Sequence, residues 1–285
     1  MFSADLSIAH LRVRIQCEAP ECCAGIAALT ALFERCASPG DAALCFTLKP
    51  ISGGASLACN TEPVWQGEEA GEVVAAFEWA FYSRAIAALY PHFVSLHAAT
   101  VSWQGHGITI AGASGAGKSS LCTAALLHGS DYFSDEYSLL DNEGCITPFP
   151  RPLQWGGETH PAFTSRDMHD SGLFGEGRYS FTGRDGQAIT SLLWHPKRLA
   201  TSPTALSMLL LPRFDATAGK VICEPLTRSQ ALMELAAEMH HKLPVQDRLR
   251  ELHRRIPAAT RIMRLVFSDV HAAWEQVEQH LTHRH

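Results

Sequence analysis

Positive charge is not in excess in this sequence of 285 residues. Its 23 lysines and arginines stand against 29 aspartates and glutamates, and the formal net charge is -6. A chain with this balance exerts no long-range attraction on nucleic acid or on an anionic membrane. We therefore expect no nucleic-acid partner.

Long apolar runs are also missing. No uninterrupted apolar stretch reaches the about 18 residues of a membrane span, and the start, MFSADLSIAHLRVRIQ, alternates and carries charge where a secretory signal would be apolar. The 46% apolar content is still enough to bury a full core. We expect a cytoplasmic protein without a membrane partner.

Cysteine pairs with metal-ligand spacing are absent as well. The nine cysteines are scattered and contain no CxxC pair of the kind used by tetrahedral zinc sites. We predict reduced thiols and a fold that needs no disulfide. The adjacent His240 and His241 are predicted to lie on a helix, where they would point to different faces, so we assign them no metal.

The first ninety residues differ in composition from the rest, since they are rich in alanine and cysteine. Alternation predicts strands over 11–15 and 43–50, and apolar spacing predicts helices over 25–37 and 71–90. The segment 51–71 has the glycines and polar residues of a loop. Because the second helix stops before Pro91, we place a boundary there and predict an amino-terminal α+β region over 1–90 and a second domain over 91–285.

The second domain is predicted to be α/β. Its expected elements are strands over 93–103 and 107–114, a helix over 118–129, a strand, acidic turn and strand over 131–141, an irregular region over 148–186, strands over 207–211 and 220–223, a helix over 229–242, a strand over 261–267 and a final helix capped by Ser268 or Asp269. The long irregular region is a candidate for an acceptor groove or lid.

One motif lies between a predicted strand and a predicted helix. The run from Gly112 to Ser119, GASGAGKS, fits the P-loop pattern GxxxxGK[ST] at every fixed position. Glycines let backbone N–H groups wrap phosphates, the lysine reaches the β and γ phosphates, and the serine hydroxyl ligates Mg²⁺. The predicted nucleotide-binding residues are Gly112, Ser114, Gly115, Ala116, Gly117, Lys118, Ser119 and Ser120.

An acidic pair follows the predicted P-loop helix. Asp135 and Glu136 come 16 and 17 residues after Ser119, near the end of a strand. Strand ends in α/β sheets gather at the ligand crevice, and phosphoryl transfer needs a carboxylate to hold Mg²⁺ or to accept the proton of the attacking hydroxyl. The pair is therefore a candidate for both roles, with a solvated turn as the alternative.

These segments together resemble the HPr serine kinase family, and more closely its short relatives from peptide-modification clusters, including lasso-peptide kinases. The matching run extends from LHAATVSW through GASGAGKSS to FSDEYSLLD and PFPRPL, and similarity continues in LLLPRF and CEPLTRSQALMEL, over roughly residues 94–282. The resemblance implies a P-loop mixed sheet of the HPr kinase and phosphoenolpyruvate carboxykinase type, ATP and Mg²⁺ as cofactors, and a peptide or protein acceptor.

The resemblance also implies roles for single residues. Asp135 corresponds to the general base, Glu136 and Ser119 to the metal side, with either carboxylate open to either role. His97 corresponds to a histidine near the phosphates, although it could equally be a core histidine. Arg151, within a Pro-Arg-Pro sequence, could neutralise phosphate charge or serve the structure.

The chain departs from the HPr kinases proper in several places. It has Asp and Glu where they have two aspartates, Ser120 where they have a glutamate, and no basic signature for the reverse reaction. We expect an ATP-dependent kinase acting on a serine or threonine hydroxyl of a peptide or protein. The alternatives are a kinase of a small hydroxylated molecule and a nucleotide-binding assembly module without kinase turnover. A homo-oligomer is compatible with the sequence.

Overall fold

The computed structural model describes residues 1–38, 40–154, 162–182 and 186–282 of a mixed α/β chain. The chain divides into two compact units. Unit 1 comprises Met1–Tyr90 and Arg151–His195, and unit 2 comprises Pro91–Pro150 and Pro196–His285. The sequence placed 151–195 in the second domain, whereas the structure groups this segment with the first ninety residues.

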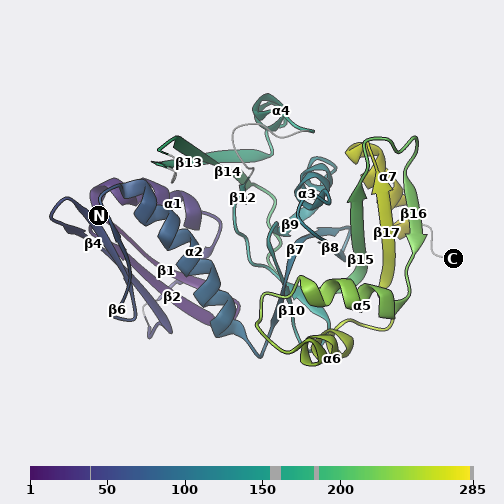
Figure 1. Cartoon of the computed structure of the whole chain (residues 1–285), viewed down its shortest axis with the longest axis horizontal. Coiled ribbons are helices and arrows are strands. Elements are labelled where there is room, and N and C mark those ends of the chain that lie inside the picture. Colours follow the sequence, from purple (N-terminus) through teal and green to yellow (C-terminus); the bar gives the residue numbers. More distant parts are fainter. Residues whose placement is uncertain (39, 155–161, 183–185, 283–285) are drawn as a thin grey trace. The chain divides into compact units, whose positions relative to one another are not determined.

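Unit 1 is built on a six-stranded mixed sheet with the order β3-β1-β2-β4-β5-β6 (Figure 1). β2 and β4 pair in parallel, and the other neighbours are antiparallel. The strands are β1 (Phe2–Ile8), β2 (Leu11–Cys17), β3 (Glu34–Arg35), β4 (Leu44–Ile51), β5 (Gly54–Cys59) and β6 (Glu62–Gly67).

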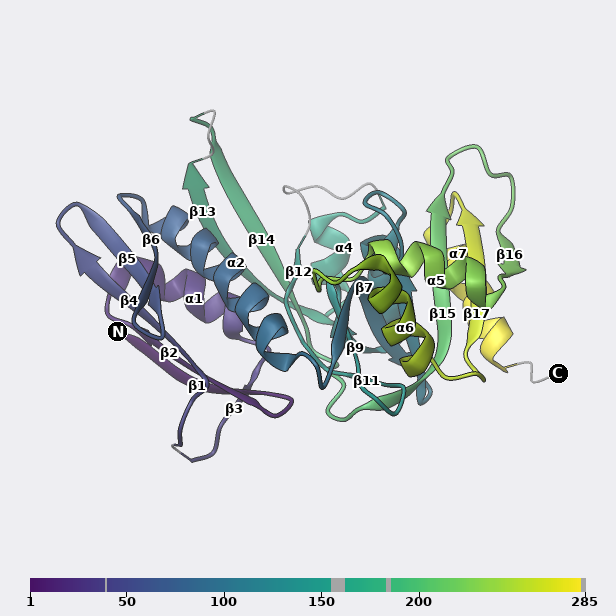
Figure 2. The ribbon, with the colours of Figure 1, turned by 60° about the horizontal axis from the view of Figure 1, so that its bottom comes forward.

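Two helices lie between this sheet and a second, small sheet of unit 1 (Figure 2). They are α1 (Cys23–Thr30), which follows the short helix η1 (Pro20–Cys22), and α2 (Ala70–Leu89). The small sheet has the order β12-β14-β13 and consists of β12 (Leu153–Gln154), β13 (Phe174–Thr182) and β14 (Ala188–Pro196), with α4 (Ser165–Asp170) before β13. Because β13 packs on both helices, the segment 151–195 belongs to unit 1.

The helices bury aromatic side chains against the large sheet. Phe46 of β4 meets Phe77 of α2 edge to face, with ring centroids 5.4 Å apart, and Phe81 stacks on Phe77 at the same distance. On the side of β13 the approach is so close that a Cβ at Gly71 would lie 1.8 Å from the Ser180 carbonyl oxygen. Only glycine fits at that contact.

Two predicted loops of unit 1 contain regular structure. The segment 51–71 forms β5 and β6, because turns with positive φ at Gly53, Asn60 and Thr61 fold it into consecutive hairpins. The region 148–186 contains β12, α4 and β13, while its residues 155–161 and 183–185 lie outside the described residues. Glycines and polar residues give both segments the composition of a loop, and this composition concealed the regular elements within them.

Unit 2 is built on a mixed sheet with the order β11-β10-β7-β8-β15-β17-β16, and β9 also pairs with β7. β8, β15 and β17 are mutually parallel, so their carboxyl ends lie at one edge. The strands are β7 (Val94–Trp103), β8 (His106–Ala111), β9 (Asp131–Ser134), β10 (Tyr137–Leu140), β11 (Cys145–Thr147), β15 (Thr204–Phe214), β16 (Ile222–Pro225) and β17 (Arg261–Phe267).

Four helices are described in unit 2. α3 (Lys118–Leu127) packs on β7, β8 and α7 (Val270–Thr282), and α5 (Arg228–Ala237) packs on α6 (Val245–Arg255). The Asp269 carboxylate accepts from the His271 and Ala272 N–H groups and caps α7, which decides between the two predicted caps. α6 was not predicted, because its sequence is mostly polar; it buries Leu252 and Arg255.

The predicted helix over 229–242 is wrong at its carboxyl end. α5 ends at Ala237, and the following residues lie beside the first half of β7, where Met239 forms an antiparallel bridge with Leu96. His97 N–H donates to the Glu238 carbonyl at 2.7 Å, and His240 N–H donates to the Ser95 carbonyl at 3.0 Å. β8 pairs with β7 only from Ala98 onward, because β8 ends at Ala111. The segment after α5 therefore lies on the same side of β7 as β8, next to the residues of β7 that precede Ala98.

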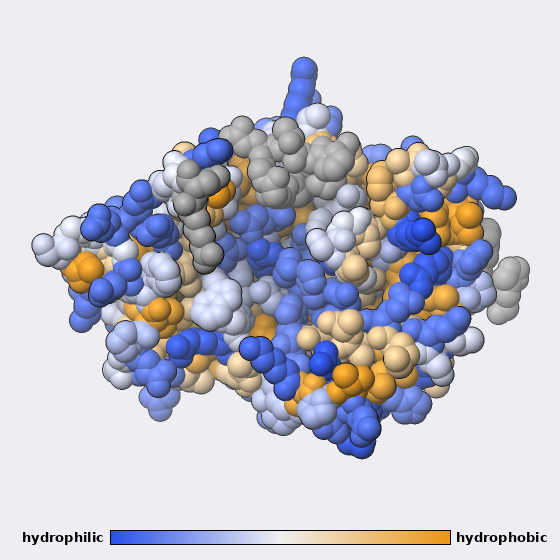
Figure 3. All heavy atoms as spheres, in the orientation of Figure 1, coloured by the Kyte–Doolittle hydropathy of each residue, from blue (hydrophilic) through white to orange (hydrophobic). Residues whose placement is uncertain are grey.

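All nine cysteines are free thiols, which agrees with the predicted absence of disulfides. Within the described ranges no helix is both long and apolar enough to cross a membrane. On the face drawn in Figure 3, apolar residues are interspersed among hydrophilic ones.

Candidate functional site

The P-loop motif forms the turn between β8 and α3, as predicted. Gly115 and Gly117 have φ of 80° and 100°, values that side-chain-bearing residues rarely adopt, and Gly117 directly precedes the first turn of α3. Among the described residues, no atom lies within 4 Å of a Cβ built at Gly115, so the tip of the loop is open on the side of these residues. Such a loop leading into a helix presents N–H groups to an anion.

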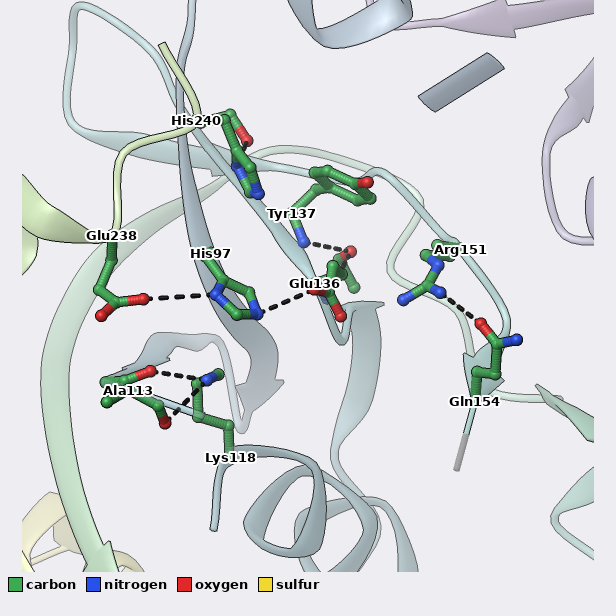
Figure 4. Close-up of polar contacts among 12 residues, drawn as sticks. His97, Ala113, Lys118, Glu136, Tyr137, Arg151, Gln154, Glu238 and His240 are labelled. Atoms are coloured by element: carbon green, nitrogen blue, oxygen red, sulfur yellow. Dashed lines mark hydrogen bonds and ion pairs between the residues drawn. The ribbon is translucent and has the colours of Figure 1, made fainter. Parts of the chain in front are cut away.

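The side chain of Lys118 is buried against this loop. It is only 8% exposed, and its ammonium donates to the carbonyl oxygens of Gly112 at 2.6 Å and Ala113 at 3.2 Å (Figure 4). Ser119 and Ser120 follow on the first turn of α3 and are partly exposed. The loop therefore holds its own lysine by two carbonyl oxygens, without a charged partner in these contacts.

The sheet register brings His97 and the acidic pair to the loop. Ala98 of β7 pairs with Ala111, the last residue of β8, so His97 lies next to the point where the loop departs. On the other side of β7, His97 pairs with Tyr137, the first residue of β10. Three adjacent strands thus align the loop, His97 and residues 135–136 in one row.

The acidic pair does not form a turn that reverses the chain. β9 and β10 both pair antiparallel with β7, with Ser134 opposite Thr100 and Tyr137 opposite His97, so the two strands run in line. Asp135 and Glu136 form the bend between them, and the Glu136 carbonyl accepts from the Ala98 N–H. A solvated turn, the alternative considered from the sequence, does not describe this bend.

The two carboxylates have different surroundings. Asp135 is 2% exposed and lies near Cys122 of α3, whose thiol pKa is raised by burial and further by the Asp135 charge. The Glu136 side chain is 34% exposed and pairs with His97 Nε2 through Oε1 at 2.8 Å. Asp135 therefore points toward the helix that carries Ser119, and Glu136 toward His97.

His97 has a second carboxylate partner, which the sequence did not predict. Its Nδ1 lies 3.3 Å from Glu238 Oε2, at the end of α5 (Figure 4). The pKa of His97 is raised, chiefly by the hydrogen bond to Glu136, while burial and the Lys118 ammonium act in the opposite direction. Glu238 follows the CEPLTRSQALMEL segment quoted for the resemblance, but helical spacing gave no sign that its carboxylate would meet His97.

His240 completes this side of the cluster. Its Nδ1 is 2.9 Å from the Ser95 hydroxyl, and its ring lies over Tyr137 with centroids 4.8 Å apart. Burial, followed by the charge of His97, lowers the pKa of His240 to about 4. The pKa values of the two neighbouring imidazoles are thus shifted in opposite directions, that of His97 upward and that of His240 downward.

The contacts that the structure gives for Arg151 are with residues of its own unit. Arg151 belongs to unit 1, where its Nη2 lies 3.1 Å from Glu78 Oε1 and hydrogen-bonds the Gln154 side chain. Its guanidinium also lies over the Tyr82 ring, 5.4 Å from the centroid. Glu78 further accepts from the Tyr179 hydroxyl at 2.5 Å. These contacts are those expected if Arg151 has the structural role that the sequence left open.

Oxygen ligands for a hard cation are present beside the loop, in Ser119, Asp135 and Glu136. Within the part of the chain that the structure describes, no three or more His, Cys, Asp or Glu side chains gather as a metal site. Mg²⁺ in nucleotide sites is commonly held by one or two protein oxygens together with phosphate and water, and this donor set suits that use.

No protein-family model matches the chain, and a search of the curated proteins also finds no match.

Proposed function

We propose that the protein is a cytoplasmic, ATP-dependent kinase of the HPr-kinase type that transfers the γ-phosphoryl group to a serine or threonine hydroxyl of a peptide or protein. The observation that supports this most is the row across β8, β7 and β9–β10. In this row the glycine-rich loop with Lys118 lies beside a partly exposed His97–Glu136 pair and a buried Asp135. A binding loop alone would not require ionisable proton carriers next to it.

On the nucleotide side, the loop N–H groups and the amino end of α3 bind the phosphates. Lys118 exchanges its bonds with the Gly112 and Ala113 carbonyls for phosphate oxygens. Mg²⁺ bound at Ser119 and Asp135 would supply compensating positive charge to the phosphates. The inward position of Asp135, near α3, supports this assignment over the base role that the family resemblance implies for it.

On the acceptor side, Glu136 is the more accessible carboxylate. The acceptor hydroxyl oxygen forms a bond to the γ phosphorus while the bond to the β–γ bridging oxygen breaks, and ADP leaves. The hydroxyl proton passes to the carboxylate. His97, held between Glu136 and Glu238, orients Glu136 and places positive charge near the transferred group.

The test uses the variants Asp135→Asn and Glu136→Gln, with γ-labelled ATP, Mg²⁺ and serine- and threonine-containing peptides, followed by mass spectrometry. Loss of a general base typically costs about 10²- to 10⁴-fold in rate. We expect Glu136→Gln to lose that factor with unchanged Mg²⁺-ATP affinity. We expect Asp135→Asn to weaken Mg²⁺-dependent ATP binding as well.

The opposite pattern would make Asp135 the base and Glu136 the metal ligand. Wild-type phosphorylation rates in both variants would remove the pair from the mechanism. Stoichiometric ATP binding by the wild type without any acceptor phosphorylation would replace the kinase by a nucleotide-binding module.

A further inference from the structure

Phe214 is a large apolar side chain exposed at the edge where the loop lies. It is the last residue of β15 and is 50% exposed. β15 runs parallel to β8, so Phe214 stands at the same carboxyl edge as the glycine-rich loop. In α/β sheets this edge is where ligands bind.

The position of Phe214 relative to the loop is fixed by two contacts. Its N–H donates to the Ala116 carbonyl oxygen at 3.1 Å. Its ring meets the buried Phe267 ring edge to face, with centroids 6.0 Å apart at 73°. Phe267 in turn packs so closely under the loop that a Cβ at Gly117 would lie 2.7 Å from its Cζ. The exposed ring is thereby tied to the loop through both backbone and side chain.

The ionisable groups lie on the other side of the loop. His97, Glu136 and Asp135 belong to β7 and the β9–β10 bend, whereas Phe214 belongs to β15, and β8 separates β7 from β15 in the sheet. A nucleoside triphosphate held with its γ end toward His97 and Glu136 extends its nucleoside end away from them, toward β15. An aromatic ring there meets the one part of the ligand with an apolar face.

We propose that Phe214 stacks the base of the bound nucleoside triphosphate, so that the carboxyl end of β15 is the nucleobase subsite. This inference rests on the proposed nucleotide-dependent function. Base–aromatic stacking tolerates every base because each has a π face, so this contact by itself does not separate adenine from guanine. Phe267 is a positioning residue for the ring.

The experiment compares Mg²⁺-ATP with Mg²⁺-tripolyphosphate, which carries the phosphates without a base, by calorimetry on the full chain. The variants are Phe214→Leu, which keeps an apolar side chain but removes the ring, and Phe214→Trp, which keeps an aromatic surface. Met233→Ala, at an exposed apolar residue of α5, is the matched control. We expect Phe214→Leu to weaken ATP binding about tenfold and to leave tripolyphosphate binding unchanged. Phe214→Trp and Met233→Ala should bind both ligands as the wild type does.

Two results would overturn the inference while leaving the loop as a phosphate site. One is equal ATP affinity in wild type and Phe214→Leu. The other is a matched loss of ATP and tripolyphosphate binding in Phe214→Leu, since that would show a damaged loop and not a lost base contact. Failure of the wild type to bind either ligand would instead overturn the proposed function itself, and the base subsite with it.

Discussion

A cluster of charged side chains in unit 1 and another in unit 2 are built differently. In unit 1, the Arg151 and Glu78 side chains are 14% and 12% exposed and are enclosed by Tyr82 and Tyr179. In unit 2, His97 lies between Glu136 and Glu238, with roughly a third of the His97 and Glu136 side chains exposed, beside a loop whose tip is open on the side of the described residues. The first cluster satisfies its own charges, and the second retains access to a ligand.

We infer from this difference that the first cluster is a structural ion pair, and we propose the second as the chemical site. Burial and the Glu78 charge raise the pKa of Tyr179, as expected for a phenol that stays protonated and donates to the carboxylate. His97 instead has a raised pKa in a partly exposed position, where proton exchange with a ligand is feasible. Three predictions test this contrast.

The largest expected effect is on Lys118. Lys118→Ala removes the only lysine of the loop, and turnover should fall by about 10²- to 10³-fold or more, because a charge that stabilises the transferring phosphoryl group is lost. Unfolding free energy should fall by about 1–3 kcal/mol, since the Gly112 and Ala113 carbonyls lose a charged hydrogen-bond donor. Turnover and urea unfolding measure the two effects, with exposed Lys242→Ala as control. Wild-type turnover in Lys118→Ala would exclude the loop from catalysis.

The next effect concerns Arg151. Arg151→Met leaves Glu78 without its ion-pair partner in a largely buried place, and unfolding free energy should fall by about 3 kcal/mol. Kinase turnover per folded molecule should change little. The double variant with Glu78→Gln should recover part of the lost stability, because the unpaired charge is gone. If Arg151→Met unfolds like the wild type but loses phosphoryl transfer, Arg151 has the phosphate-neutralising role that the family resemblance implied and not a structural one.

The smallest effect is a titration. A histidine whose pKa is raised in the folded state contributes stability that is fully present below its unfolded pKa, near 6.5, and is lost as pH rises through the folded pKa. Glu136→Gln should lower the His97 pKa in NMR titration, and Glu238→Gln should lower it less, in the order of the two contacts. In both variants the unfolding free energy should fall less than in the wild type as the pH rises above about 6.5. An unchanged His97 pKa in Glu136→Gln would show that this ion pair does not form in solution.

The sequence predicted the elements whose signals are local. β8, the loop and α3 follow from one motif, and α2 follows from apolar spacing that ends before Pro91. The mixed α/β class is confirmed. β5 and β6 were missed because small residues and turn residues gave a loop-like composition, although Ala55, Leu57 and Cys59 alternate toward the core.

Within the candidate site, the sequence indicated the groups that are neighbours along the chain and missed the contacts that depend on strand register. The pairing of His97 with Glu136 is set by alignment of β10 on β7, and the approach of Glu238 is set by where α5 ends. Neither distance can be read from spacing along the chain. Phe214 was quoted within LLLPRF, but only the parallel pairing of β15 with β8 places it beside the loop.

The interrupted course of unit 1 has a consequence during synthesis. After Tyr90 emerges, α1 and α2 are covered on one side by the six-stranded sheet, but β13 and β14 arrive only when His195 has been made. At roughly 5–20 residues per second this delay is on the order of ten seconds. During that interval the other side of both helices, including Gly71 with its bare backbone, is open to water, and all of 91–150 is synthesised. A ribosome-bound chain stopped within 91–150 would therefore carry an incomplete unit 1, and a chaperone that shields apolar surface would have its target there.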